Sequence, residues 1–141
     1  MESLTLDGIP PNALLLVDSA PIVYLLDGHP KLASRFRPLF EAHAAGDVRF
    51  AVTTITLAEV LTGPLQNGDE ALTRRYRAVL ESWDIVPLDA GIADSAARLR
   101  AALRLKLADA VQAASALAIN AFALVTHDRD FARVKALRIL S

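Results

Sequence analysis

Apolar residues occur in short, dense runs separated by longer segments of mixed character. Runs of this kind, bounded by turn residues, are typical of buried strands. The first run ends on a carboxylate, Asp18, and a second apolar segment follows at once. A carboxylate beside such a run must be exposed at a strand end, paired, or bound to a cation. The pattern predicts strands at residues 14–18, 48–53, 84–88 and 122–126, with a possible last strand at 137–140.

Amphipathic or alanine-rich segments fill the spaces between these runs and predict helices. We expect the helix over residues 31–47 to be interrupted or started afresh near Pro38, and the helix over residues 56–64 to stop at Gly63-Pro64. Proline lacks the backbone donor that a helix interior needs. Further helices are predicted at residues 20–28, 71–83, 90–103, 107–121 and 128–134.

This alternation of strands and helices predicts the fold class. Crossover connections produce a parallel sheet that is covered on both faces. The functional crevice of such a sheet lies beyond the carboxyl ends of its strands. We therefore predict one α/β domain over residues 13–141, with a central parallel sheet of four to five strands flanked by helices, and an N-terminal lead-in over residues 1–12.

Composition narrows the class of protein. Of the 141 residues 53% are apolar, which suits a substantial core, and the absence of cysteine excludes disulfides and thiolate metal sites. The net charge of −1 does not indicate a nucleic-acid partner. We interpret the basic cluster Arg129, Arg133, Lys135 and Arg138 as a solvated helix face in preference to the alternative, a phosphate-binding surface. Because no signal peptide or apolar run of about 20 residues is present, we expect a cytoplasmic protein that is not inserted in a membrane.

Four carboxylates are expected at the rim of the sheet: Asp18, Glu59, Asp109 and Asp128. Each has a purely structural explanation, since the three aspartates suit helix caps or first turns and Thr56 to Glu59 has the spacing of a capping box. Together, however, carboxylates a few ångströms apart repel by roughly 1 to 4 kcal/mol per pair. A hard divalent cation such as Mg²⁺ or Mn²⁺ reverses that sign, whereas the three histidines are too scattered for a zinc site.

Several segments resemble a known family. LLLVDSAPIVYLL, TITLAEVLTGP and LKLADAVQAASALAINAFALVTHDRDF, followed by RIL, are similar to the successive motifs of PIN-domain proteins, in particular the VapC-type toxins of bacterial toxin–antitoxin pairs. The resemblance covers nearly the whole chain from about residue 13 and implies a PIN-like three-layer fold with metal-dependent RNA cleavage. It matches Asp18, Glu59, Asp109 and Asp128 to the family's acidic quartet, and Asp130 is a fifth acid able to assist or replace Asp128.

The sequence departs from the family pattern at three places. Ser19-Ala20 stands where the family often has Thr-Asn, although Ser19 still offers a hydroxyl group. His127 precedes Asp128 where asparagine is frequent, and we expect it to be a neighbour of the site rather than a ligand. Ala108 stands where proline often precedes the third acid. These departures concern the surroundings of the acids and not the acids themselves.

On this basis we predict a Mg²⁺- or Mn²⁺-dependent endoribonuclease of the PIN/VapC type. Asp18 and Asp109 are predicted to be the main metal ligands, while Glu59 and Asp128 act through water or hold a second cation. Neutralising one member of the quartet, as in Asp18→Asn, is expected to abolish cleavage and to leave the fold intact or more stable.

Two further polar residues are candidates for assisting roles. Thr126, at a strand end, is able to bond the phosphate or a water of the metal site, or simply to satisfy a helix end. Gln112 lies one turn beyond Asp109, where it either orients a carboxylate or is an exposed polar position.

The resemblance implies three partners: an RNA substrate, a cognate antitoxin whose tail occupies the acidic groove, often with an arginine, and a second copy of the chain in a homodimer. Two alternative functions stay open. One is a catalytically silent PIN-like module for protein interaction. The other is a phosphotransfer or phosphatase domain, although such domains usually need a lysine at a later strand end, where this chain has VTHD.

Overall fold

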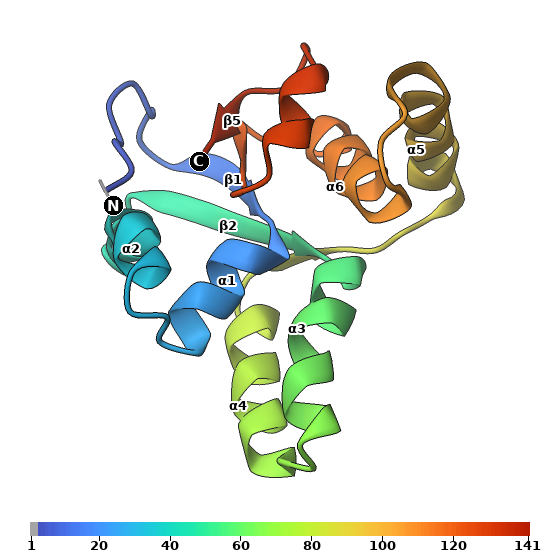
Figure 1. The fold of residues 1–141 in the computed structure, drawn as a ribbon. Coiled ribbons are helices and arrows are strands. Elements are labelled where there is room, and N and C mark those ends of the chain that lie inside the picture. Colours follow the sequence, from blue (N-terminus) through green and yellow to red (C-terminus); the bar gives the residue numbers. More distant parts are fainter. Residues whose placement is uncertain (1–2) are drawn as a thin grey trace.

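The computed structural model describes residues 3–141, and a parallel sheet lies at its centre (Figure 1). The strands lie side by side in the order β3-β2-β1-β4-β5, and every neighbouring pair is parallel. This arrangement confirms the predicted α/β fold class. The strands are β1 (Ala13–Val17), β2 (Val48–Thr53), β3 (Asp84–Val86), β4 (Ala123–Val125) and β5 (Ile139–Leu140).

Helices cover both faces of the sheet. In Figure 1, α1 to α4 lie on one side of the sheet and α5 and α6 on the other. Because both faces are buried, each strand needs apolar side chains at successive positions. The helices are α1 (Ser19–Leu26), α2 (Leu32–Ala44), α3 (Thr54–Gln66), α4 (Glu70–Glu81), α5 (Ala90–Leu103) and α6 (Leu107–Ala118), followed by the 3₁₀ helix η1 (Arg129–Arg133).

Strand β1 explains the dense apolar run that opens the sequence. Leu15 and Val17 belong to the core beneath α1 to α4, whereas Leu16 belongs to the core beneath α5 and α6. All three side chains are fully buried. Leu15 lies opposite Phe50 of β2 and Ala123 of β4, so β1 is paired on both edges. The carboxyl end of β1 is therefore in the middle of the sheet rim, and Asp18 is the next residue.

The predicted helix boundaries at proline are wrong at two places. Helix α2 is continuous through Pro38, and α3 continues through Gly63 and Pro64 to Gln66. Proline removes one backbone hydrogen bond but holds φ near the helical value, so packing can outweigh the loss. Pro64 is buried, and its carbonyl accepts a hydrogen bond from the Asp69 N–H at 3.0 Å as the chain turns into α4.

Part of the predicted lead-in packs against the domain. Leu4 is buried in the core, and its N–H donates to the Arg35 carbonyl at 2.8 Å.

Among residues 3–141, no helix is long and apolar enough to cross a lipid bilayer.

Candidate acidic site at the carboxyl ends of the strands

Asp18 is held in place by three hydrogen-bond donors. It is 9% exposed and caps α1, since its Oδ1 accepts from the Ser19 N–H at 2.9 Å. Oδ1 also accepts from Gln112 Nε2 at 2.9 Å, and Oδ2 accepts from the Thr126 hydroxyl at 2.8 Å. A carboxylate oxygen has two lone pairs, so Oδ2 keeps one free acceptor position while Oδ1 keeps none.

Gln112 connects the Asp18 carboxylate to the start of α3. The side chain is 1% exposed, so the alternative of an exposed polar position is wrong. Its Nε2 donates to the Thr56 hydroxyl at 2.8 Å as well as to Asp18, and its Oε1 accepts from the Thr53 hydroxyl at 2.6 Å. Thr53 in turn caps α3 by accepting from the Thr56 N–H at 3.1 Å. A fully bonded buried amide of this kind defines one orientation for Asp18.

Thr126 forms the other support of Asp18. It follows β4, is fully buried, and accepts from the Asp128 N–H at 3.0 Å while donating to Asp18. The Asp18 N–H donates to the Val125 carbonyl at 2.8 Å, which joins the two strand ends. The hydroxyl thus fixes the geometry between the first and fourth acids of the predicted quartet.

Asp109 has the opposite environment. It lies in the first turn of α6, and its Oδ2 is buried without a hydrogen-bond partner among the described residues. Burial, followed by the negative charges of Asp128 and Asp18, raises the pKa of Asp109 from 3.8 to about 6, and the positive charge of Lys106 opposes this rise. The carboxyl group is therefore short of favourable partners, as expected for a group that binds a cation.

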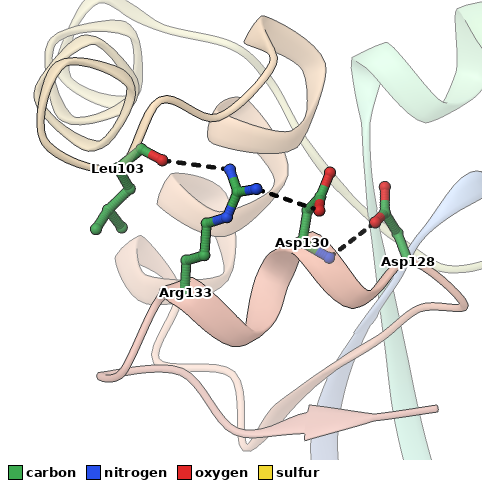
Figure 2. A network of polar contacts seen from close by, with 4 residues as sticks. All are labelled: Leu103, Asp128, Asp130 and Arg133. Carbon is green, nitrogen blue, oxygen red and sulfur yellow. Dashed lines mark hydrogen bonds and ion pairs between the residues drawn. The ribbon is translucent and has the colours of Figure 1, made fainter.

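Asp128 and Asp130 lie beside Asp109. One carboxylate oxygen from each of the three residues falls within 4.8 Å of the others. Asp128 caps η1 by accepting from the Asp130 N–H at 2.9 Å, as shown in Figure 2. Figure 2 also shows Arg133, which contacts Asp130 at 3.6 Å and donates to the Leu103 carbonyl at 3.4 Å. The fifth acid therefore belongs to the cluster, and Asp18 lies outside it.

Glu59 approaches from α3. The helix begins at Thr54 and is capped by Thr53, so Glu59 lies beyond the first turn and the capping-box alternative is wrong. Although the residue as a whole is exposed, desolvation of its carboxyl group raises its pKa. The negative charge of Asp18 raises that pKa further, while a hydrogen bond from the Ser19 side chain lowers it. Glu59 and Ser19 thus face Asp18 from outside the acidic cluster.

All four acids of the predicted quartet line a hollow of about 690 Å³. Ser19 and Gln112 also line it. Tyr24 and His127 form another part of its wall, and the Tyr24 hydroxyl lies 3.2 Å from His127 Nδ1. Tyr24 was not among the predicted site residues. The signal available in the sequence was a polar aromatic residue in the helix that follows Asp18.

The acidic cluster, two of whose members, Asp109 and Asp128, line this hollow, fits a hard divalent cation. All of the clustered donors are carboxylates, which suit Mg²⁺ and Mn²⁺ and do not suit the nitrogen- and sulfur-rich sites of zinc. Asp109 Oδ2, which is buried and has no hydrogen-bond partner in the described part of the chain, is an oxygen that such a cation would satisfy. Asp18 has only one free acceptor position, on Oδ2, because its other positions are occupied by donors.

A family model for the PIN domain matches residues 15–137. Since this match spans most of the chain and the fold agrees with it, the chain belongs to the PIN-domain family. No curated protein sequence matches significantly.

Solved structures with the same fold include toxin–antitoxin proteins. A toxin–antitoxin complex from Klebsiella pneumoniae is 26% identical, with a TM-score of 0.71 over 90% of this chain and 96% of that one. VapBC2 from Rickettsia felis, bound to a DNA fragment from its promoter, is 23% identical, with a TM-score of 0.71 over 91% and 99%. VapC20 from Mycobacterium tuberculosis, a toxin that cleaves the sarcin-ricin loop, is 15% identical, with a TM-score of 0.68 over 85% and 94%.

Proposed function

We propose that this protein is a Mg²⁺- or Mn²⁺-dependent endoribonuclease of the VapC toxin type. The observation that carries the proposal is the cluster of Asp109, Asp128 and Asp130, in which the buried Asp109 Oδ2 has no hydrogen-bond partner among residues 3–141. Membership of the PIN-domain family and the toxin–antitoxin neighbours support the same activity. An acidic cluster without a ligand would be costly to keep, because its members repel one another.

Asp109, Asp128 and Asp130 would hold the cation, with Asp18 Oδ2 as a further donor. When bound, such an ion supplies a water nucleophile of lowered pKa and neutralises charge that develops on the phosphate. The other residues position this set. Gln112 and Thr126 keep Asp18 in one orientation, so that its free acceptor position does not turn away.

The test is cleavage of purified tRNA, rRNA and mRNA, with and without EDTA. We expect cleavage that EDTA abolishes and that Asp109→Asn and Asp128→Asn lower by at least about 100-fold, the loss typical when a group that stabilises the transition state is removed. Asp94→Asn is the matched control, because Asp94 is an exposed acid on α5 that pairs only with Arg98 among the described residues. Mn²⁺ binding without cleavage of any RNA would instead favour a protein-interaction module.

We also propose the partners that the neighbours suggest. A small antitoxin would bind at the acidic hollow, where a cationic side chain meets four carboxylates. The protein would act in the cytoplasm as a homodimer. Light scattering should then give twice the 15.2 kDa mass of the chain, and a mass of one chain at micromolar concentration would contradict the dimer.

A further inference from the structure

A second hollow adjoins the acidic one. Its volume is about 620 Å³, and its lining includes Arg35 of α2, Arg129 of η1 and Ser141. His127 and Asp128 line both hollows, as does Arg129. The segment from residue 127 to residue 129 therefore forms a wall that the two hollows share.

The two hollows differ in charge. Asp18, Glu59 and Asp109 line only the acidic hollow, whereas Arg35 lines only the second. Because Asp128 and Arg129 line both, the second hollow has two guanidinium groups and one aspartate side chain, and the acidic hollow has four carboxylates and one guanidinium group. Arg129 is exposed, and no ion pair or hydrogen bond involves its side chain among residues 3–141. Arg35 donates to the Ser141 main-chain oxygen, which places its guanidinium group at the edge of this hollow.

The shared wall is held in position by aromatic contacts. His127 Nδ1 lies 3.2 Å from the Tyr24 hydroxyl, and the two rings meet edge to face at 5.7 Å between centroids. The fully buried Phe36 contacts the same imidazole edge to face at 5.9 Å. Because these contacts fix the His127 ring, the passage from one hollow to the other keeps a defined shape.

We propose that the second hollow is a phosphate subsite for the RNA strand. The inference rests on the proposed ribonuclease function: a strand cleaved at the acidic hollow continues across His127, and a neighbouring phosphate binds Arg129 and Arg35. An anionic strand is repelled by a carboxylate cluster, so cations beside that cluster are needed to retain it. Guanidinium groups bind phosphate oxygens with two parallel hydrogen bonds and fix the register of a strand without reading its sequence.

The test compares Arg129→Gln with Arg74→Gln. Arg74 is an exposed arginine on α4 that lines neither hollow, so both variants lose the same charge. Binding of a single-stranded RNA oligonucleotide is measured in EDTA over a range of salt concentrations. One phosphate contact to a single strand contributes a slope of about 0.7 in log Kd against log salt, or about fivefold in Kd at 0.1 M salt. For Arg129→Gln we expect the slope to fall and the Kd to rise by these amounts. Arg129→Lys should keep most of the slope and of the affinity, and Arg74→Gln should change neither.

Cleavage kinetics add a second readout. Arg129→Gln should raise KM with little change in kcat, because the contact is made equally before and during the reaction. Equal Kd and equal salt slope for Arg129→Gln and the parent would overturn the subsite, whatever the cleavage rate. Loss of binding in Arg129→Gln in a protein that cleaves no RNA would leave the subsite intact and refute the proposed activity instead.

Discussion

Asp18 and Asp109 carry the same carboxyl group in opposite environments. Asp18 accepts from three donors, whereas a buried oxygen of Asp109 accepts from none among the described residues. Hydrogen bonds to the charged form stabilise it, while burial without partners favours the protonated form. The two residues are therefore expected to respond in opposite ways when each is replaced by its neutral amide.

We expect Asp109→Asn to stabilise the protein in EDTA at neutral pH. The pKa of Asp109 is about 6 in the folded state, against an ordinary value of 3.8. Folding therefore favours the protonated form, and the stability of the parent falls as the pH rises from about 4 to about 6. The variant escapes this loss, which we place at about 1 kcal/mol because solvent screens a partly exposed group. Urea denaturation at pH 4 and pH 7.5 measures the difference, which should vanish at the lower pH.

Asp18→Asn is the matched comparison. Charge repulsion alone indicates that this variant is more stable than the parent, whereas we expect its free energy of unfolding to be lower. An amide places an N–H₂ group where a carboxylate oxygen accepted a hydrogen bond, so at least one buried donor loses its acceptor. We expect the free energy of unfolding to fall by about 1 to 3 kcal/mol at neutral pH. Stabilisation of Asp18→Asn and Asp109→Asn by equal amounts would show that repulsion alone governs both.

Gln112 and Ser115 are both buried polar residues of α6, but only Gln112 forms side-chain hydrogen bonds among residues 3–141. Replacing each of them tests what those bonds contribute. Gln112→Leu leaves Asp18 and Thr53 short of partners and should cost about 2 kcal/mol. It should also lower cleavage by roughly 10- to 100-fold, as changes behind metal ligands do. The Ser115 hydroxyl is buried and unpartnered among residues 3–141, so Ser115→Ala should be neutral or slightly stabilising. Denaturation and single-turnover cleavage of both variants check the contrast.

At the scale of elements, the ends of helices decide where the site residues point. Helix α3 begins at Thr54, two residues before the first residue of the predicted helix, and this shift removes Glu59 from the first turn and leaves its carboxyl group free to face Asp18. Helix α6 has no side-chain cap at Lys106, and Asp109 lies in its first turn. Both details depend on which backbone groups the neighbouring elements satisfy.

The end of α5 gives a stability prediction at this scale. Arg104 adopts a left-handed conformation with φ of 57°, and its N–H donates to the Arg100 carbonyl. Glycine adopts this conformation without the steric cost that other residues incur, so Arg104→Gly should raise the free energy of unfolding by about 0.5 to 1 kcal/mol. Ala101→Gly, inside the same helix, should lower it by about 1 kcal/mol. Two changes of the same sign in thermal or urea unfolding would contradict this account.

At the scale of the whole molecule, the parallel sheet brings together acids that are more than 100 residues apart. Asp18 follows β1 and Asp128 follows β4, and these strands are paired neighbours. Helices α3 and α6 bring Glu59 and Asp109 to the same hollow. The repulsion among these groups is distributed over four separate elements, so it opposes the assembled fold rather than any one element.

A divalent cation should therefore stabilise the fold as well as support activity. At a Mn²⁺ concentration 100 times its Kd, the free energy of unfolding should rise by about 2.7 kcal/mol. Asp109→Asn and Asp128→Asn should remove most of this gain, and Asp94→Asn should keep it. Thermal unfolding with and without Mn²⁺ measures the effect. An equal shift in all of these proteins would point to a site elsewhere.

Much of the fold was predictable because its signals are local. The apolar runs, the alternating helices and Asp18 at the end of the first run predict a parallel sheet with candidate site residues at its rim. The structure has this sheet and brings the four predicted acids to one hollow. Pro38 and Pro64 misled the boundaries because their local cost is outweighed by packing between distant elements. The family motifs indicated which acids belong together, but not what surrounds each one.

The sequence by itself determined the order of the elements, the candidate acids and the hard-cation chemistry that carboxylates imply. Only the tertiary structure decided that Gln112 and Thr126 bond Asp18, that Asp130 joins Asp109 and Asp128, and that Arg129 borders the site. The physical reason is the separation along the sequence over which each interaction acts. Backbone preferences and apolar periodicity act over a few residues. Hydrogen-bond partners and electrostatic neighbours come from segments far apart in the sequence, which lie side by side only in the folded sheet.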